Sequence, residues 1–595
     1  MADPGPRGGS RQHTLLRLAA APATVDAGVA LLFGALACLW WWPLPLHVRD
    51  AQLEWPVIDP AYNEWILAWG RHALLHDPRH FFDANMFYPH PFVLAWGDNL
   101  FALTLLSIPL AAAAGTVGAH NLLVLGSTAA SGFTTYLLAR RVVGPRSAAV
   151  VAGVLFSFAW FRVAEWTHLQ ILSTQWIPLV FLAAERLRDR VTPARTALLA
   201  LSVWLVLATN VYLAVFTAIA FGVFVVMLLA TRRLTVRALV SCAIGWAVAG
   251  SAALPLYLPS LRYQRAIGIT RSLAAQELPA TLRDYLPWPP PGSVGRALAG
   301  QAAVPVSGWH ALSLVAGVLA ASAVVLAVAR RRGPWLAVAP YAAIAALAAA
   351  SSLGPAIRWH ARPLVDNPVF LAEYHLVPGA SVLRVPGRWS LMVAFALALV
   401  AAAAVAALSA RWRRGPRVAL AVVILVLIAV ELVPSRFALH SSYALADFPE
   451  EQWLADQPGT DAVLQLPISA DNAAYETQVI EARRMLLSTY HWKRRVSGAV
   501  SPTFPPAYPE DARLLADLPS DPAALDLLRS WHVRWVVFRA ADYRAEGLDD
   551  AAARRGLDSI AGLRLVRDWG DTAIWEVDGV RPGTARTGSV SGRSP

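Results

Sequence analysis

The stretch HVRDAQLEWPVIDPAYNEWILAWGRHALLHDPRHFFDANMFYP, from His47 to Pro89, lies between two long apolar segments and sets the frame for the rest of the chain. It is rich in tryptophan, histidine and carboxylate side chains. The loop that contains it carries seven acidic residues, which are Asp50, Glu54, Asp59, Glu64, Asp77, Asp83 and Asp98. Acids and aromatic rings gathered between apolar segments indicate a polar site held at a membrane surface.

The composition places the chain among membrane proteins. Of its 595 residues, 56% are hydrophobic and only 15% are charged, and the mean hydropathy is +0.47. A soluble domain carries roughly 25% charged residues. Apolar runs of about 20 residues recur along the first three quarters of the chain, which predicts a mainly α-helical, polytopic membrane protein.

The net charge of +12 comes almost wholly from arginine, since Lys493 is the only lysine. The arginines form short clusters between apolar segments. This pattern fits membrane topology better than nucleic-acid binding, so we expect no nucleic-acid partner. The two cysteines, Cys38 and Cys242, fall inside predicted spans and cannot build a disulfide framework or a zinc site.

The parity of these arginine clusters predicts eleven transmembrane helices. Segment 99–116 contains Pro109, and its crossing would place the first cluster opposite all the others, so we predict a re-entrant or surface helix there. The N-terminus is then cytoplasmic and the C-terminus lies on the outer side of the membrane. The predicted spans are 26–46, 118–139, 147–163, 170–185, 194–210, 212–231, 236–258, 308–329, 334–353, 388–410 and 417–433.

This topology divides the chain into four parts. They are a cytoplasmic N-terminus (1–25), a transmembrane domain (26–433) with outer loops 47–117, 259–307 and 354–387, an extracytoplasmic α/β domain (434–580) and a disordered tail (581–595). In the outer domain we expect strands over DAVLQLPIS, WHVRWVVFR, LRLVRDW and TAIWEVDG, and helices over EDARLLADL and DPAALDLLRSW.

Asp59 is the strongest single candidate for chemistry in the first outer loop. It is followed by Pro60 and by an aromatic segment that we expect to form a helix on the membrane surface. The carboxylate can serve as the N-cap of that helix or as a general base at the surface, and the two roles are compatible. Asp77 and Asp83 are in contexts typical of turns.

Arginines also occur in the outer loops, where topology does not require them. Arginine binds phosphate bidentately and stays charged; the alternative is that these side chains snorkel among lipid headgroups. The RVPGR motif at the entrance of a span favours phosphate binding for Arg384 and Arg388. Candidates of this kind are Arg262, Arg265, Arg271, Arg283, Arg358, Arg384 and Arg388.

A second group of polar residues lies at the outer end of the span 147–163, in FRVAEWTHLQ. Polar side chains that meet at one end of a span often line a cavity. We therefore count Arg162 and His168 as candidate substrate-binding residues. The segment STYHWKRRVSG, from Ser488 to Gly498, fits either a contact with an acceptor or an ordinary surface.

Several segments together resemble the bacterial GT-C-type membrane glycosyltransferases and their uncharacterised relatives. They are VIDPAYNEWILAWGRHALLHDPRHFFDANMFYPHPFVLAWGDNLFA (Val57–Ala102), AEWTHLQILSTQWIPLVFLA (Ala164–Ala183), LRVPGRWSLMVAFALAL (Leu383–Leu399) and WHVRWVVFRAADY (Trp531–Tyr543). The resemblance covers most of the chain through loose motifs. It implies a GT-C-like transmembrane domain followed by a soluble outer domain.

The resemblance also implies an activity, namely transfer of a sugar at the outer face from a polyprenyl-phosphate-linked donor to a glycan, lipid or protein acceptor. Asp59 matches the first-loop acid that acts as base, with Glu54 as the nearest second acid, and Asp98 and Tyr88 of the same loop are expected to contact substrate. The tight acidic pair of many such enzymes is missing, which leaves a divalent metal cofactor open; we expect no other cofactor.

Two other classes stay open at this point. A lipid-linked glycan transporter would place ionisable residues near the membrane midplane, whereas Asp26, Glu185 and Glu431 all lie near the ends of spans. A non-catalytic relative would keep the fold and use the outer domain for assembly or binding. Convergence of Asp59, Arg384 and His168 on one outer cavity would favour the enzyme.

Overall fold

The computed structural model describes residues 22–583 apart from 54–57, 268–271, 286–312, 331–333, 361, 435–436, 471–473, 500–504, 506 and 522. Among these residues, eight helices are long and apolar enough to cross a membrane, and they coincide with eight of the predicted spans. The predicted spans 194–210 and 308–329 correspond to shorter apolar helices, and 170–185 to two short helices. The protein is therefore a mainly helical, polytopic membrane protein with a smaller β-containing domain.

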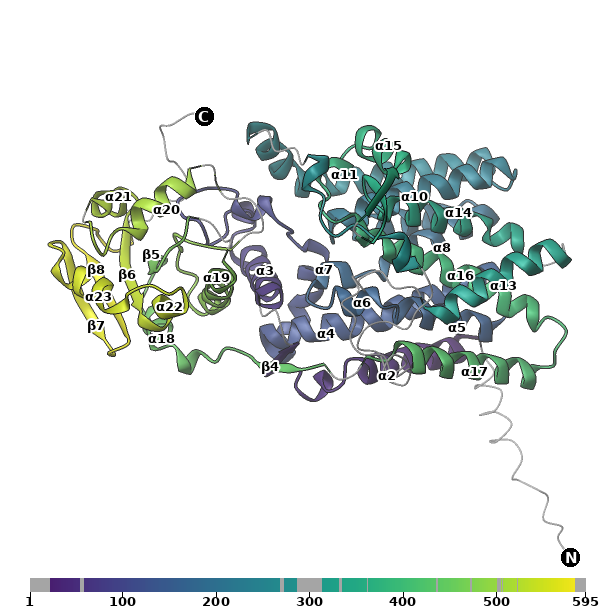
Figure 1. Ribbon diagram of the computed structural model, residues 1–595, viewed down its shortest axis with the longest axis horizontal. Helices are drawn as coiled ribbons and strands as arrows, with labels where there is room; N and C mark the ends of the chain where they lie inside the picture. The colour runs from purple at the N-terminus through teal and green to yellow at the C-terminus, as the bar shows by residue number, and fades with distance from the viewer. Residues whose placement is uncertain are drawn as a thin grey trace, which may run out of the picture.

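The helices of the transmembrane part form one elongated bundle, and the C-terminal domain lies beyond one end of it (Figure 1). The bundle helices are α2 (Pro22–Trp40), α4 (Phe101–Val143), α5 (Arg146–Ser157), α6 (Phe161–Ala164), α7 (Leu169–Leu172), α8 (Trp176–Asp189), α9 (Pro193–Leu207), α10 (Val211–Ala230), α11 (Val236–Ile267), α13 (Leu314–Arg330), α14 (Trp335–Ser352), α16 (Ser390–Leu408) and α17 (Arg414–Leu432).

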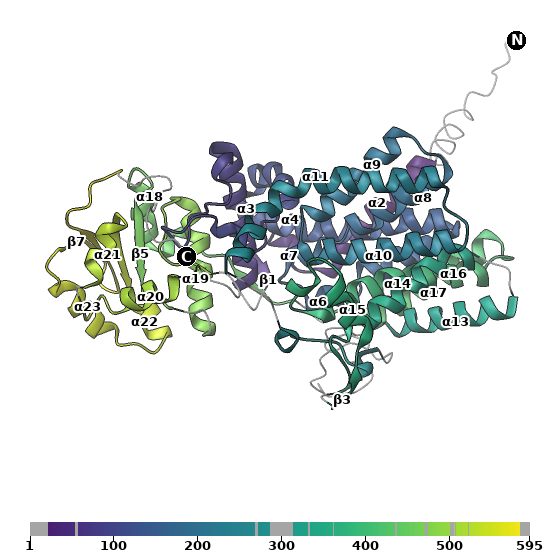
Figure 2. The same cartoon turned by 90° about the horizontal axis from the view of Figure 1, so that it is seen from above.

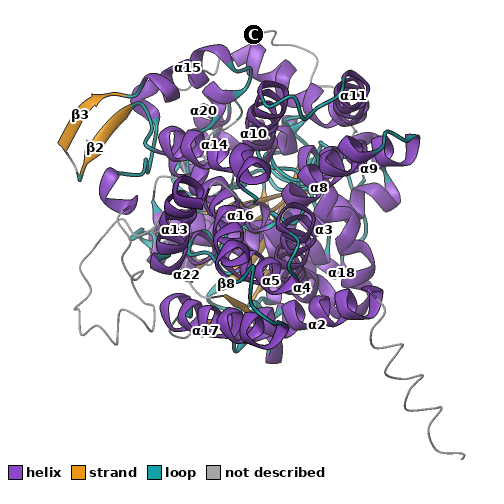
Figure 3. Ribbon diagram, turned by 90° about the vertical axis from the view of Figure 1, so that its right-hand side faces the viewer, coloured by secondary structure: helices purple, strands orange, loops and turns teal. Residues whose placement is uncertain are grey.

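Helix α16 lies inside the bundle, surrounded by α5, α13 and α14 (Figure 3). Its sequence SLMVAFALALVAAAAVAAL is dominated by alanine, and most of its residues are buried. Small side chains let neighbouring helix backbones approach closely, which is the main source of packing between helices in lipid. The alanine run therefore explains why this span is central.

Helix α4 contains the segment 99–116 for which we predicted a separate helix. Its helical backbone is broken at Gly115, whose φ is 76° and ψ is −179°, so the part that begins at Phe101 and the following span are two helices joined at a kink. Glycine tolerates this left-handed backbone without a steric penalty. The charge-based topology, with this segment on the outer side, stays a prediction.

Helix α3 (Ile58–His76), which we expected on the membrane surface, is instead packed between α4 of the bundle and α19 (Tyr475–Leu487) of the C-terminal domain. Figures 1 and 2 show α3 and α19 side by side. Trp65 is fully buried and donates a hydrogen bond to Asn85. The aromatic side chains of α3 therefore pack inside the protein rather than against lipid.

The C-terminal domain contains a four-stranded sheet of order β5-β6-β8-β7, in which β5 and β6 are parallel and the other neighbours antiparallel. The four expected strands and both expected helices, α20 and α21, are present. Its elements are β5 (Ala462–Leu466), β6 (Val533–Arg539), β7 (Leu563–Asp568), β8 (Thr572–Val577), α18 (Pro449–Asp456), α19, α20 (Tyr508–Ala516), α21 (Ala524–Ser530), α22 (Ala540–Ala545) and α23 (Asp550–Ser559).

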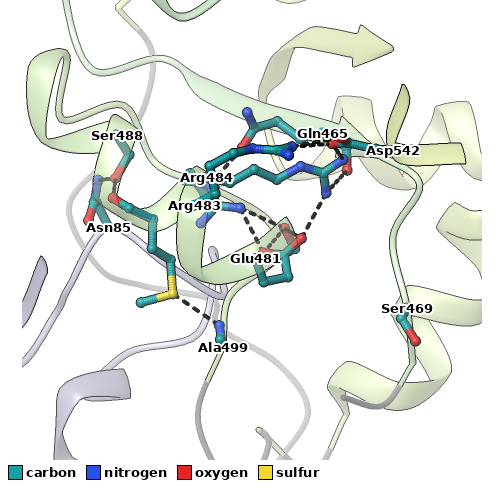
Figure 4. Close-up of polar contacts among 12 residues, drawn as sticks. Asn85, Gln465, Ser469, Glu481, Arg483, Arg484, Ser488, Ala499 and Asp542 are labelled. Carbon is teal, nitrogen blue, oxygen red and sulfur yellow. Dashed lines mark hydrogen bonds and ion pairs between the residues drawn. The ribbon is translucent and has the colours of Figure 1, made fainter. Parts of the chain in front are cut away.

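Helix α19 is fixed to the sheet by a buried network of charges. Glu481 accepts hydrogen bonds from Arg484 at 2.8 Å, from Arg495 at 2.7 Å and from Ser497. Arg484 also donates to Asp542 at 3.0 Å. Figure 4 shows Glu481, Arg484 and Asp542 of this network close to Gln465. None of the four charged side chains is more than 5% exposed.

The first outer loop and the C-terminal domain share backbone contacts. Strand β1 (Ala51–Leu53) pairs with β4 (Leu439–Ser441). The backbone N–H of Tyr88 donates to the carbonyl of Arg495 at 2.9 Å, and that of Arg495 to the carbonyl of Asn85 at 3.1 Å. The C-terminal part of the chain therefore holds this loop at two places, at β1 and again at Asn85 and Tyr88.

The third outer loop carries a β-hairpin that projects from the side of the bundle (Figures 2 and 3). Its strands are β2 (Ala356–Trp359) and β3 (Arg362–Asp366), and α15 (Pro368–Leu376) follows. The chain then returns to the bundle through the short helix η8 (Pro386–Trp389), which contains Arg388 and leads directly into α16.

Candidate active site

Asp59 is the second residue of α3, inside the helix rather than ahead of it, and its side chain is 38% exposed. A carboxylate in the first turn is favoured by the helix dipole, and Pro60 suits this turn because its missing N–H has no helical partner there. On the opposite side of the same turn, Ala61 packs against Ala482 and Leu486 of α19. The position of Asp59 therefore depends on the C-terminal domain.

His168 links Asp59 to the bundle. The predicted span 147–163 corresponds to α5 and α6, and a short irregular stretch separates α6 from α7. There the Nε2 atom of His168 lies 3.4 Å from Oδ2 of Asp59, and its Nδ1 lies 3.0 Å from Oε2 of Glu165. The imidazole ring, 20% exposed, thus stands between two carboxylates.

Glu165 in turn forms a bidentate ion pair with Arg388. The Nε and Nη2 atoms of Arg388 donate to the two carboxylate oxygens at 2.9 and 3.0 Å, and its guanidinium lies over the ring of Tyr212 at 4.8 Å. Burial alone would raise the pKa of Glu165, but Arg388 and the imidazole of His168 outweigh it and hold that pKa well below its usual range. Glu165 is therefore ionised.

Asp98 adds a third carboxylate to the group. It follows the short helix η3 (Val93–Trp96) and accepts a hydrogen bond from Asn210 at 2.9 Å. Burial raises the pKa of Asp98, against the opposing effects of Arg388 and His168 and of the hydrogen bonds from Gln170 and Asn210. The structure thus brings Asp59, His168, Arg388 and Asp98 together, from segments far apart in the sequence.

Tyr62 is a site residue that the sequence analysis missed. It lies one turn after Asp59 on α3, and burial followed by the charges of Asp98 and Asp59 raises the pKa of its phenol. Its hydroxyl is buried and has no hydrogen-bond partner among the described residues. The helical spacing from Asp59 was the only signal that could have identified it.

Within the part of the chain that the structure describes, the side chains of the other predicted site residues do not contact this group, so only Asp59 and His168 of the three residues expected to converge lie together. Arg384 contacts Glu277, with Nε 3.4 Å from the carboxylate, although its backbone N–H donates to the hydroxyl of Tyr212 at 2.8 Å. Tyr88 faces the C-terminal domain, with its ring 5.5 Å from the guanidinium of Arg494. Glu54 lies outside the described residues.

Arg162 occupies a framework position. Its side chain is fully buried, and it donates to the carbonyl of Leu172 at 2.7 Å and to the hydroxyl of Thr174 at 2.6 Å. The guanidinium also lies near the rings of Phe156 and Phe161. These contacts tie α6 to the end of α7 and to the residues that follow it, so Arg162 holds the framework together.

No group of three or more histidine, cysteine, aspartate or glutamate side chains is arranged to hold a metal ion within the part of the chain that the structure describes. The carboxylates of Asp59 and Glu165 are instead separated by the imidazole of His168. Acid–base chemistry at Asp59 is what these residues can perform directly.

A further buried acid, Glu64, lies behind the site on another face of α3. Glu64 is fully buried, accepts a hydrogen bond from Gln52 of β1 at 2.6 Å, and lies 3.8 Å from Nδ1 of His120. Burial raises the pKa of the Glu64 carboxyl to about 8, although the hydrogen bond from Gln52 opposes the change. Glu64 is therefore mostly protonated at neutral pH.

This predicts that Glu64→Gln stabilises the protein as the pH rises. The unfolded chain releases the Glu64 proton near the ordinary value of 4.5, while the folded chain keeps it to about pH 8. Between these values the folded state binds more protons, so its stability falls with rising pH. The neutral variant avoids a cost of about 3 kcal/mol at pH 7.

Thermal unfolding in detergent between pH 5 and 9 checks this expectation. The difference in melting temperature between Glu64→Gln and the wild type should grow with pH. Asp50→Asn, at an acid that is 71% exposed in the same loop, is the control and should run parallel to the wild type. A constant difference for Glu64→Gln would contradict a raised pKa.

Comparison with known proteins agrees with this fold. No family model matches the sequence, and no curated protein matches it either. Among solved structures, the arabinofuranosyltransferase AftD from Mycobacteria matches with a TM-score of 0.54 and 16% identity, over 93% of this chain and 40% of that one. A mutant of the same protein gives 0.53 and 16%, over 93% and 41%. ArnT from Cupriavidus metallidurans bound to undecaprenyl phosphate matches more loosely, with 0.46 and 13%, over 93% and 99%.

The chain therefore shares the fold of this arabinofuranosyltransferase, which agrees with the membrane-glycosyltransferase fold that its loop motifs indicated. At 16% identity the similarity concerns the fold alone. The chain also spans only about two fifths of the length of the arabinofuranosyltransferase that it matches. The reaction has to be argued from the site.

Proposed function

We propose that the protein is an integral-membrane glycosyltransferase that moves a sugar from a polyprenyl-phosphate-linked donor to an acceptor hydroxyl at the outer face of the bacterial cytoplasmic membrane. The observation that carries the proposal is the chain of contacts from Asp59 through His168 and Glu165 to Arg388. It places an exposed carboxylate and a fixed cation in one polar group beside a helix bundle.

The chemistry assigns one task to each end of this group. Asp59 takes the proton of the acceptor hydroxyl, and the oxygen then attacks the anomeric carbon of the donor. The bond from that carbon to the phosphate oxygen breaks, and its electron pair leaves with the polyprenyl phosphate. Arg388, with Arg384 from the same motif, offsets the charge that develops on the phosphate. In-line attack inverts the anomeric centre.

Two alternatives are less well supported. For a lipid-linked glycan transporter, the acids within the helical bundle would be the coupling groups, but Asp26 pairs with Arg140 and Glu185 with Arg188. Glu431 accepts from the backbone N–H groups at the start of α13. A non-catalytic assembly or binding protein could use the buried Glu165–Arg388 pair for stability, but it would not require a partly exposed carboxylate joined to that pair through an imidazole.

Asp59→Asn is expected to lower sugar transfer by roughly 10²- to 10⁴-fold, because the amide cannot accept the proton. The assay follows label from a panel of radiolabelled polyprenyl-phosphate sugars into new products, in membranes with matched amounts of wild type and variant. Asp77→Asn is the control, since Asp77 is also a partly exposed acid of this loop with a histidine partner, His80.

Label in a new product with the wild type and with Asp77→Asn, but not with Asp59→Asn, would establish the transferase and its base. Equal label with Asp59→Asn would exclude Asp59 as the base. If the wild type transfers no label from any donor of the panel, the proposal fails and the two alternatives gain weight.

A further inference from the structure

We propose that His168 is the proton acceptor behind Asp59, and that Glu165 is the positioning residue that makes it one. This inference rests on the proposed function and extends it. The sequence assigned His168 to substrate binding. The geometry instead places its imidazole between two carboxylates, with Asp59 as the proton donor on one side and the Glu165–Arg388 pair as a fixed support on the other.

The first argument is the orientation of the ring. Nε2 of His168 faces Asp59 at 3.4 Å and Nδ1 faces Glu165 at 3.0 Å. Hydrogen bonding by Nδ1 to a carboxylate favours the tautomer whose Nε2 carries a free electron pair. That electron pair is directed at Asp59, the residue that receives the acceptor proton in the proposed reaction.

The second argument is charge. Glu165 is only 7% exposed, and its carboxylate accepts hydrogen bonds from two nitrogen atoms of Arg388, Nε and Nη2. Glu165 therefore stays ionised and cannot take up the proton. Its negative charge stabilises the imidazolium that forms when His168 takes up the proton. The charged and titratable groups facing His168 are Asp59 from α3, Glu165 from the end of α6, Asp98 from the loop after η3 and Arg388 from η8.

The third argument is proton balance. The proton leaves the acceptor hydroxyl for Oδ2 of Asp59 as the new C–O bond forms, and the electron pair of the broken C–O bond goes to the phosphate. The proton then passes from Asp59 to Nε2 of His168, which returns Asp59 to the carboxylate form. Because the His168 side chain is 20% exposed, water can remove the proton before the next turnover.

The test uses His168→Ala and His168→Asn in the full-length protein. Both should lower the turnover rate by on the order of 10²-fold, and His168→Asn keeps a polar side chain toward Glu165. The low-pH limb of the rate profile should move in both variants, because they lack the imidazole that takes part in the proton transfer of the wild type. Free imidazole in the buffer should restore part of the rate of His168→Ala and leave the wild-type rate unchanged.

The control is His80→Asn, because His80 contacts Asp77 in an exposed pair of the same loop; it should keep the wild-type rate and pH profile. A merely structural role of His168 would give a lower rate with an unmoved pH limb and no rescue by imidazole, which would overturn the inference. Wild-type transfer that needs Asp59 but not His168 would overturn the relay alone. Absence of wild-type transfer from any donor would instead remove the function on which it rests.

Discussion

Arg388→Met is expected to abolish detectable sugar transfer and to destabilise the folded protein by about 3 to 5 kcal/mol. Removing one partner of a buried ion pair leaves the other charge without compensation, and here the remaining group is Glu165, which is 7% exposed. The same substitution removes the cation proposed to face the leaving phosphate. Unfolding midpoints in detergent and the transfer assay measure the two effects separately.

The chain offers an internal control in the same motif. Arg384 is 27% exposed, and its partner Glu277 is 54% exposed. Such a pair contributes only about 0 to 1 kcal/mol, so Arg384→Met should leave the unfolding midpoint nearly unchanged while weakening transfer. In the double variant Glu165→Gln/Arg388→Met much of the stability should return without activity. Equal midpoints for Arg388→Met and the wild type would show that the buried pair is not formed.

Glu481→Gln is the second substitution with a large expected effect, also about 3 to 5 kcal/mol. Glu481 accepts hydrogen bonds from two buried arginines, Arg484 and Arg495, whose charges would lose their shared partner. Because α19 also packs on α3 around Ala61, loosening it should lower sugar transfer as well. Thermal unfolding and limited proteolysis of the C-terminal domain report the first effect, and the transfer assay reports the second.

Glu476→Gln makes the same chemical change one and a half turns earlier on α19, at an exposed position. It should alter the free energy of unfolding by no more than about 0.5 kcal/mol and leave sugar transfer unchanged. If both variants behaved alike, the network around Glu481 would contribute nothing to the stability of the domain, and the proposed support of Asp59 by α19 would lose its basis.

The fold was predictable because its signals are local. A run such as SLMVAFALALVAAAAVAAL needs no knowledge of its neighbours to indicate a span, and alternation within LRLVRDW and TAIWEVDG identifies two strands. Segment 99–116 was harder, because its separation from the next span depends on the backbone of one residue, Gly115. Helix α3 was misplaced because tryptophans suit a lipid interface and a protein interface equally well.

The site was predictable in part. Asp59, His168 and Arg388 stand in separate motifs that each suggested chemistry, and the structure brings them together. Arg162 shows why residue type is not sufficient, since in the sequence it looks no different from Arg388 but its guanidinium binds a backbone carbonyl. Tyr62 carries no charge, and nothing in its segment distinguishes it from the other aromatic residues, so only its position on α3 reveals it.

The first outer loop packs against both domains. This also sets the order in which parts of the protein can fold during synthesis. Asn85 donates a hydrogen bond to Ser488, 403 residues later in the chain. At 5 to 20 residues per second, a ribosome needs roughly 20 to 80 s to cover that distance. Throughout this time α3 has one packing partner, α4, and lacks the other. A nascent chain can therefore insert most of its spans long before Asp59 is in place, and the proposed transfer activity should appear only when α19 has folded.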